Sequence, residues 1–203
     1  MPLVSVVIPV HRDDDALTQL LMQLSLDERL EVIVSEPPPL GRGAQMNAGA
    51  RRAQADWLLF LHADSRLPAG WVDTFQRVAS DPTIVAGWFR FALDAREWQA
   101  RVIERLVAAR VRLWKLPYGD QGIFVRRGVF TGIGEFREWP LMEDVEFVQR
   151  LRRAGRVVEL PLPLVTSARR WKRDGWFRCS ARNLMLVTLY FLGVAPARLA
   201  RWY

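Results

Sequence analysis

The sequence contains a single cysteine, Cys179, and only two of its 29 basic residues, Lys115 and Lys172, are lysines. One cysteine can form neither an intramolecular disulfide nor a cysteine metal cluster, which is typical of a protein in a reducing compartment. Acidic residues are also few, at 22, so the chain has a net charge of +7. A basic chain favours an anionic partner such as a nucleotide, an acidic membrane surface or a nucleic acid, and arginine suits phosphate better than lysine does.

Long hydrophobic runs are missing as well. The longest uncharged stretch begins at Asn183, and its apolar part, Leu184 to Ala197, has 14 residues, fewer than the roughly 20 needed to span a bilayer. The apolar start, Met1 to Val10, lacks a charged leader region, so we expect a strand there rather than a signal peptide. We therefore expect a cytoplasmic protein. The chain has 203 residues, half of them hydrophobic, which is enough for one domain with a full core.

Strands and helices are predicted to alternate along the first 93 residues. β-Branched runs indicate buried strands, and apolar residues at helical spacing indicate helices between them. Such alternation is typical of a parallel sheet with right-handed crossovers, in which ligands bind beyond the carboxyl ends of the strands. The predicted strands cover residues 4–10, 30–35, 57–61 and 84–93, and the predicted helices cover residues 17–24, 43–53 and 71–79.

The second half of the chain is less regular. We expect short strands at residues 121–125 and 157–160, and helices at 97–113, 143–154, 178–191 and 195–202. In the first of these helices Trp98, Val102, Leu106 and Leu113 lie near one face. The fold class is therefore α/β, a single domain with a mostly parallel central sheet flanked by helices and followed by C-terminal helices. We divide it into a nucleotide-binding half (1–93), an acceptor and catalytic half (94–177) and C-terminal helices (178–203).

Polar side chains follow three of the predicted strands. His11 follows the first strand, Glu36 the second, and His62 and Asp64 the third. Asp64 can reach a divalent cation and the phosphates that the cation neutralises, or it can cap the following turn. Glu36 can accept a hydrogen bond from a ribose hydroxyl, or it can be a loop acid beside prolines. The carboxyl ends of parallel strands meet at one edge, so we expect these side chains to share a crevice.

A glycine-rich segment opens the second predicted helix. Gly41 and Gly43 allow the backbone to approach a ligand, the helix N-terminus favours an anion, and Arg42 adds charge. The segment is not a Walker loop, which requires Gly-Lys followed by Ser or Thr. No Gly-x-Gly-x-x-Gly follows the first strand either, so we do not expect a nicotinamide site.

Two acids, Glu143 and Asp144, begin a later helix, where a carboxylate can serve only as a partner of the helix dipole. A polar turn upstream, containing Asp120 and Gln121, can bring an acceptor close to them. In that case one of the acids can take the proton from a hydroxyl, an action typically worth about 10²- to 10⁴-fold in rate.

Adjacent arginines stand beside a tryptophan in the segment Ser167-Ala168-Arg169-Arg170-Trp171. Arginines in this arrangement can clamp a diphosphate leaving group and stabilise the charge that develops on it. A solvated basic loop is the alternative interpretation.

In their order and spacing, these motifs resemble a family 2 glycosyltransferase of the GT-A fold. More narrowly, the chain is similar to a small bacterial subgroup described as radical-SAM/selenodomain-associated transferases, and the resemblance covers nearly the whole chain. The motifs are Ser-Val-Val-Ile-Pro-Val at 5–10, the acid after the second strand, Gly-Arg-Gly-Ala-Gln-Met-Asn-Ala-Gly at 41–49, Leu-His-Ala-Asp at 61–64, Gly-Asp-Gln-Gly at 119–122, Glu-Asp at 143–144 and Arg-Arg-Trp at 169–171.

The resemblance implies inverting transfer of a sugar from a nucleotide-sugar donor to an acceptor hydroxyl. It implies that Asp144 is the general base and that Asp64 holds Mn²⁺ or Mg²⁺ on the donor diphosphate. It further implies that Pro9, His11 and Glu36 line the nucleoside pocket, that Gly41, Arg42, Gln45, Asn47 and His62 lie near the donor, that Asp120, Gln121 and Glu143 face the acceptor or the sugar, and that Arg169, Arg170 and Trp171 hold the leaving diphosphate.

One position departs from the family pattern, because His62 stands where the family has the first aspartate of Asp-x-Asp. Histidine can ligate Mn²⁺ but is a poor ligand for Mg²⁺. Either Asp64 is the sole protein carboxylate on the metal, or His62 only hydrogen-bonds the nucleotide. Two other functions stay open. A nucleotidyltransferase would need a glycine-rich loop after the first strand, and a non-catalytic anion-binding module would tolerate the lost aspartate.

The C-terminal segment, Asn183 to Tyr203, combines an apolar helix with surrounding arginines. It can lie in a membrane interface near a lipid-linked acceptor, at the inner face of the membrane, or it can pack on the domain or on a second subunit. We expect the packed arrangement, with a homo-oligomer as one form of it, and no nucleic-acid partner.

Overall fold

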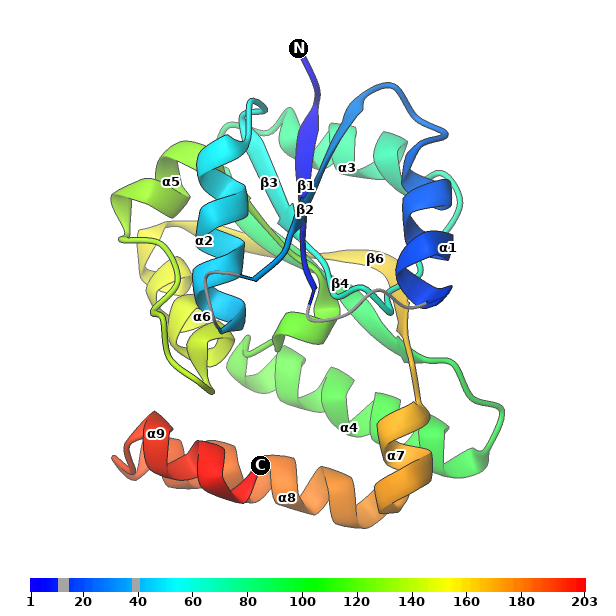
Figure 1. Ribbon diagram of the computed structural model, residues 1–203, viewed down its shortest axis with the longest axis vertical. Coiled ribbons are helices and arrows are strands. Elements are labelled where there is room, and N and C mark those ends of the chain that lie inside the picture. The colour runs from blue at the N-terminus through cyan, green and yellow to red at the C-terminus, as the bar shows by residue number, and fades with distance from the viewer. Residues whose placement is uncertain (11–14, 38–40) are drawn as a thin grey trace.

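A six-stranded sheet organises the computed structural model, which describes residues 1–10, 15–37 and 41–203 (Figure 1). The strand order is β2-β1-β3-β5-β4-β6. Only β5 runs antiparallel to its neighbours, β3 and β4, so the predicted α/β fold with a mostly parallel sheet is confirmed. The strands are β1 (Val4–Pro9), β2 (Leu30–Ser35), β3 (Trp57–Phe60), β4 (Ile84–Leu93), β5 (Ile123–Arg126) and β6 (Arg156–Thr166).

Helices cover both faces of the sheet. Successive strand residues point to opposite faces, so Val6 and Ile8 of β1 pack with helices α1 (Asp15–Leu24) and α3 (Trp71–Ala79). Val7, between them, packs on the other face with α2 (Arg42–Arg52), α5 (Arg127–Gly132) and α6 (Glu143–Ala154). This two-sided burial explains why β1 is buried along its whole length and, apart from Ser5, apolar.

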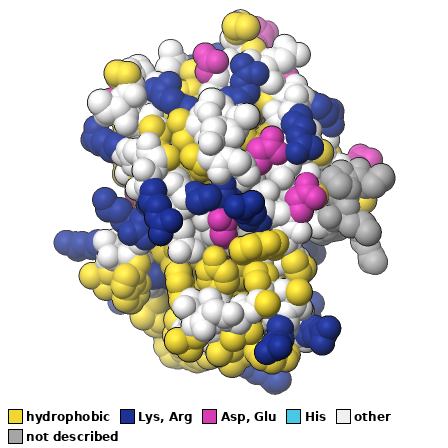
Figure 2. Space-filling view, turned by 90° about the vertical axis from the view of Figure 1, so that its left-hand side faces the viewer, with side chains coloured by type: hydrophobic (Ala, Val, Ile, Leu, Met, Phe, Trp, Pro, Cys, Tyr) yellow, Lys and Arg dark blue, Asp and Glu magenta, His cyan; other side chains and the backbone are white. Residues whose placement is uncertain are grey.

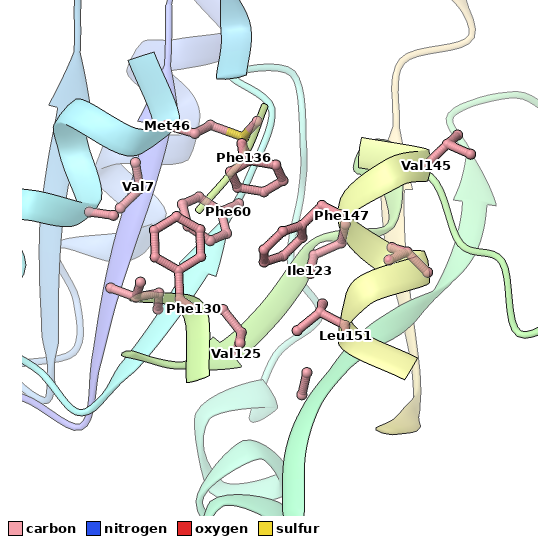
Figure 3. Packing of buried hydrophobic residues seen from close by; sticks show 14 of the residues in the cluster. Val7, Met46, Phe60, Ile123, Val125, Phe130, Phe136, Val145, Phe147 and Leu151 are labelled. Atoms are coloured by element: carbon pink, nitrogen blue, oxygen red, sulfur yellow. The ribbon is translucent and has the colours of Figure 1, made fainter. Parts of the chain in front are cut away.

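Aromatic rings fill the core between α2, α6 and the sheet (Figure 3). The rings of Phe136 and Phe147 have centroids 4.1 Å apart, and Phe60 meets Phe136 edge-on at 4.9 Å. Asn47 of α2 fixes the chain beside these rings, because its amide bonds both the N–H and the carbonyl of Phe136. The packing therefore holds the first turns of α2 and α6 at the same edge of the sheet.

Phe124 of β5 is the centre of the opposite core. It is fully buried and meets Trp57, Phe75 and Phe89, with ring centroids 5.3–6.2 Å away. Gly87 in β4 makes room for this ring, since a Cβ atom there would lie 2.3 Å from the Phe124 ring. Real Cβ atoms do not approach so closely, and so this position in β4 requires glycine.

A third layer lies below the sheet and contains α4 (Trp98–Trp114), α7 (Arg169–Asp174), α8 (Trp176–Phe191) and α9 (Pro196–Leu199) (Figure 1). Helix α4 buries Ala100, Ile103 and Val111. The apolar face noted in its sequence, with Trp98, Leu106 and Leu113, is its exposed face. Within the described ranges, no helix is both long and apolar enough to cross a membrane.

Three elements differ from the sequence prediction. Strand β6 extends to Thr166, well past the predicted end at residue 160, and contains Pro161 and Pro163. Proline is tolerated there because β6 is an edge strand, where a missing N–H need not break a ladder. Helix α5 was not predicted, and the segment at Arg169, for which a solvated basic loop was the alternative interpretation, begins the short helix α7.

Candidate functional site

A cavity of about 480 Å³ lies where β3 ends, and half of the predicted site residues line it, among them the predicted base Asp144. His62 and Asp64 follow β3, while Asp120 lies in a 3₁₀ turn (Gly119–Gln121) just before β5. Because β5 is antiparallel to β3, the entrance to β5 and the exit from β3 share one edge of the sheet. The remaining predicted residues in the lining are Arg42, Asp144, Arg169, Arg170 and Trp171.

Arg42, in the first turn of α2, connects three parts of this site. Its Nε donates to Glu143 Oε1 at 2.5 Å, its Nη1 lies 2.9 Å from His62 Nε2, and its Nη2 lies 3.7 Å from Asp144 Oδ2. Burial opposes its charge, but the attraction of Glu143 and Asp144 outweighs burial and raises the Arg42 pKa. Arg42 is therefore a permanent cation that positions the acids at the start of α6.

The contact with Arg42 determines which ring nitrogen of His62 carries the proton. A guanidinium can only donate, so His62 Nε2 must accept and the ring proton must sit on Nδ1. Burial, reinforced by the charges of Arg42 and Arg170, lowers the His62 pKa to about 3, so the ring is neutral at physiological pH. Its Nε2 lone pair is occupied by Arg42, which favours a hydrogen-bonding role over metal ligation.

Asp144 is held by the backbone. Gly119 N–H donates to its Oδ2 at 2.7 Å, and Val145 N–H donates to its Oδ1 at 2.8 Å. The close approach favours glycine at position 119, since a Cβ there would make tight contacts, 3.2 Å from Asp144 Oδ2 and 3.1 Å from His62 Nε2. The carboxylate also sits at the N-terminus of α6, where the helix dipole favours negative charge. Asp144 thus has a fixed orientation at the cavity wall.

Asp120 contributes a second carboxyl group to the cavity. Its Oδ1 is buried and has no hydrogen-bond partner among the described residues. Burial raises the pKa of Asp120 to about 6, against the attraction of Arg110, and Asp144 adds to the rise. A buried acceptor without a donor costs free energy unless a ligand hydroxyl or water supplies the hydrogen. The geometry fits the predicted role of Asp120 as a partner of the sugar or acceptor.

We expect Asp120→Asn to stabilise the protein at high pH and not at low pH. The Asp120 carboxyl binds its proton more tightly in the folded state than in the unfolded chain, where it keeps the ordinary pKa of 3.8. The free energy of unfolding of the wild type therefore falls as pH rises from about 4 to 6. The variant should be more stable by about 2 kcal/mol at pH 8, or about 4–8 °C in Tm, and equal near pH 4. Thermal melts across this range test it, and the same gain at every pH would contradict the titration.

Basic side chains from α7 also line the cavity. Arg169 and Arg170 begin α7, and the Arg170 guanidinium lies over the rings of Trp171 and Tyr203, 5.2 Å from each. Trp171 is itself buried, packs against Phe91 and donates from Nε1 to the Ser180 hydroxyl. The tryptophan therefore anchors α7 and α8 together, and the two arginines present charge to the cavity.

The residues present can hold a divalent cation only together with a ligand. Asp64 lines the cavity as the predicted carboxylate, whereas His62 Nε2 is engaged by Arg42. The described part of the chain contains no cluster of three His, Cys, Asp or Glu side chains that could hold a metal by themselves. One carboxylate plus diphosphate oxygens and water is a usual arrangement for Mg²⁺, so Asp64 fits a cation that arrives with a nucleotide.

Several predicted site residues lie outside this cavity. His11 falls outside the described residues, and Glu36 is exposed beyond β2. Pro9 ends β1, Gly41 precedes α2 with a φ of +94°, and Glu143 is buried against Arg42. The amides of Gln45, Asn47 and Gln121 bond the backbone at Val10, Phe136 and Phe89, respectively, so each of these three braces the fold.

The sequence did not identify every residue of the site, and Tyr118 and Arg110 are two that it missed. Tyr118 lines the cavity, and the Arg110 guanidinium stacks on its ring, 3.4 Å from the centroid. Arg110 also donates to Gln121 Oε1 at 3.3 Å and attracts Asp120. In the sequence, Arg110 is one of several arginines on helix α4, and no local signal separates it from the solvent-facing ones.

Solved structures resemble this fold. One is the mannosyltransferase PcManGT from Pyrobaculum calidifontis in complex with GDP-Man and Mn²⁺, with a TM-score of 0.67 and 17% identity over 99% of this chain and 68% of that one. Another is S. aureus TarS 1–349 in complex with UDP-GlcNAc, with a TM-score of 0.56 and 13% identity over 82% of this chain and 58% of that one. At such identities the likeness shows the fold, which is that of GT-A glycosyltransferases.

The sequence itself was also compared with known families. No curated protein matches the chain. The family model described as glycosyl transferase family 2 matches residues 12–137, more than half of the chain. This match covers α2, the end of β3 and the turn before β5, which supply Arg42, Asp64 and Asp120 to the cavity. The chain therefore belongs to glycosyl transferase family 2.

Proposed function

We propose that this protein transfers a sugar from a nucleotide-sugar donor to an acceptor hydroxyl, with inversion at the anomeric carbon. The observation that carries the proposal is the composition of one cavity, in which Asp64, Asp120 and Asp144 face Arg42, Arg169 and Arg170. Family membership favours glycosyl transfer over nucleotidyl transfer. The two similar structures described above hold GDP-Man and UDP-GlcNAc, which supports a nucleotide-sugar donor.

In this proposal Asp144 is the general base. The acceptor oxygen attacks the anomeric carbon and gives its proton to the Asp144 carboxylate as the new C–O bond forms. The bond between the anomeric carbon and the phosphate oxygen breaks, and the nucleoside diphosphate leaves with the electron pair. Gly119 N–H keeps the base oriented, and Asp120 Oδ1 is free to accept from a sugar or acceptor hydroxyl.

The leaving diphosphate gains negative charge, and Arg169 and Arg170 stabilise that charge. Fixed cations aimed at developing charge are worth more in a closed cavity than in water. Asp64 would hold Mn²⁺ or Mg²⁺ on the same diphosphate, and the cation would supply further charge neutralisation there. A neighbouring structure that contains Mn²⁺ supports the metal.

A thermal-shift screen of nucleoside diphosphate sugars, with and without Mn²⁺ or Mg²⁺, tests the donor site. A donor that binds only the native state at about one hundred times its Kd stabilises it by about 2.7 kcal/mol. For a chain of this size we expect Tm to rise by about 5–10 °C. The part of the rise that needs the metal should disappear in Asp64→Asn.

Asp56→Asn is the matched control, because Asp56 is an exposed acid that is not part of the cavity. It should keep the full donor-dependent rise. If no nucleoside diphosphate sugar raised Tm, the proposed donor class would be wrong. If Asp64→Asn kept the metal-dependent part, Asp64 would not be the metal ligand.

A further inference from the structure

An exposed apolar surface covers the lower end of the molecule. Of the fourteen exposed large hydrophobic side chains in the described ranges, eleven lie on α4, on α8 or after α8. On each helix most of them lie on a face away from the buried residues, and Trp98 of α4 meets Phe177 of α8 with ring centroids 5.9 Å apart. We define the apolar platform as Trp98, Leu106 and Leu113 of α4 with Phe177, Leu184 and Phe191 of α8.

Figure 2 shows hydrophobic side chains gathered at this lower end, with basic side chains at its edge. Leu106, Leu113 and Leu184 are each more than 60% exposed, which is unusual for a cluster of leucines on a monomer surface. Large contiguous apolar patches mark surfaces that contact a partner or a membrane. We therefore expect the platform to contact a partner or a membrane.

The charge around the platform indicates what binds to it. Residues 160–203 hold eight Lys and Arg and one Asp, a net charge of +7, which equals that of the whole chain. Nearby acids are already paired, as Asp174 is with Arg173 and Arg182, and Glu97 with Lys172. An apolar face rimmed by unbalanced arginine is typical of helices that lie in the interface of an anionic bilayer. A second copy of the same face would bring these positive charges together.

The cavity and the platform lie on adjacent faces of α8. Asn183, Leu186 and Val187 line the cavity, whereas Leu184 and Phe191 face outward. A helix with its side chains is about 10 Å across. A bilayer under the platform would therefore lie within about one helix diameter of the cavity wall.

We propose that the apolar platform docks this protein on an anionic lipid bilayer, with α4 and α8 lying in the plane of the membrane interface. The hydrophobic side chains enter the boundary between headgroups and acyl chains, and arginines such as Arg105, Arg112 and Arg178 contact the lipid phosphates. Docking needs no spanning helix, in agreement with the length of α8, which has 16 residues.

Co-sedimentation of the full chain with vesicles tests the proposal. We expect binding to phosphatidylcholine vesicles that contain about a quarter phosphatidylglycerol, and little binding to pure phosphatidylcholine. The double variant Leu106→Glu/Leu184→Glu should bind at least tenfold more weakly, because each change places a charge in the apolar contact. Met22→Glu is the matched control on α1, since Met22 is 58% exposed and lies outside the platform, and it should bind as the wild type does.

Three results would overturn the proposal: no binding to the anionic vesicles, undiminished binding by the double variant, or a dimer of the free protein that the double variant dissociates. The last would make the platform an interface between copies. Light scattering after gel filtration measures the oligomeric state, and circular dichroism melts show that the variants fold. Donor-dependent rises in Tm are measured without vesicles, so their failure would count against the proposed function and not against docking.

Discussion

Replacing Asp144 by asparagine should lower the rate of sugar transfer by about 10²- to 10⁴-fold, the usual contribution of a positioned general base. Asparagine has nearly the shape of aspartate, and its single oxygen can accept from one of the two backbone N–H groups, those of Gly119 and Val145, that the carboxylate binds. It cannot take a proton from the acceptor hydroxyl. The loss should therefore appear in kcat, while donor binding, measured as the rise in Tm, should change little.

The measurement is the release of nucleoside diphosphate from a donor that the thermal-shift screen identifies, with and without candidate acceptors. Asp56→Asn serves again as the control for an acid outside the cavity, and it should retain wild-type kcat. Full activity in Asp144→Asn would remove Asp144 from the role of base. Asp120, with its unpaired Oδ1 in the same cavity, would then be the acid to test next.

Phe124→Ala should destabilise the fold by about 3–5 kcal/mol, which corresponds to a fall in Tm of about 6–20 °C. The ring is fully buried and in contact with Trp57, Phe75 and Phe89. The neighbouring backbone at Gly87 is closed around it, since even a Cβ there would collide with both the ring and the Val158 carbonyl. A site so tightly enclosed cannot collapse to fill the cavity that alanine leaves.

Phe177→Ala makes the same chemical change at a ring that is 52% exposed, and it should cost less than about 1 kcal/mol. Urea or thermal unfolding of both variants measures the difference. Similar losses for the two variants would mean that the core around Phe124 repacks, and that this ring is not central to the stability of the sheet.

The helices and strands of the first half could be predicted because their burial follows a simple period. β1 is buried on both faces and, apart from Ser5, is an unbroken apolar run. The predicted strand at residues 157–160 is shorter than β6 because Pro161 and Pro163 normally end a strand. They are tolerated in β6 because it lies at the edge of the sheet, and that position depends on the tertiary fold. For α4 the sequence shows an apolar face, but it does not show whether that face is buried or exposed. In the structure the face is exposed.

The candidate site was predictable where function depends on residues at strand ends and helix starts. Asp64, Asp120 and Asp144 stood out because acids follow or precede apolar elements, and the structure brings all three to one cavity. Arg110 and Tyr118 could not be found this way, because their role depends on how α4 lies against the turn before β5. Gln121 looked like a ligand residue, yet its amide is used to hold β4.

The direction of the strands also determines where a label or tether can be attached without disturbing the site. The amino ends of β2, β3 and β4 lie at the edge of the sheet opposite the cavity, and the N-terminus lies at that same end of the molecule (Figure 1). Tyr203, by contrast, lines the cavity and its ring lies beside Arg170. A sensor surface or dye coupled near Met1 would leave the cavity and the apolar platform open to solution, whereas one coupled after Tyr203 would start at the cavity wall.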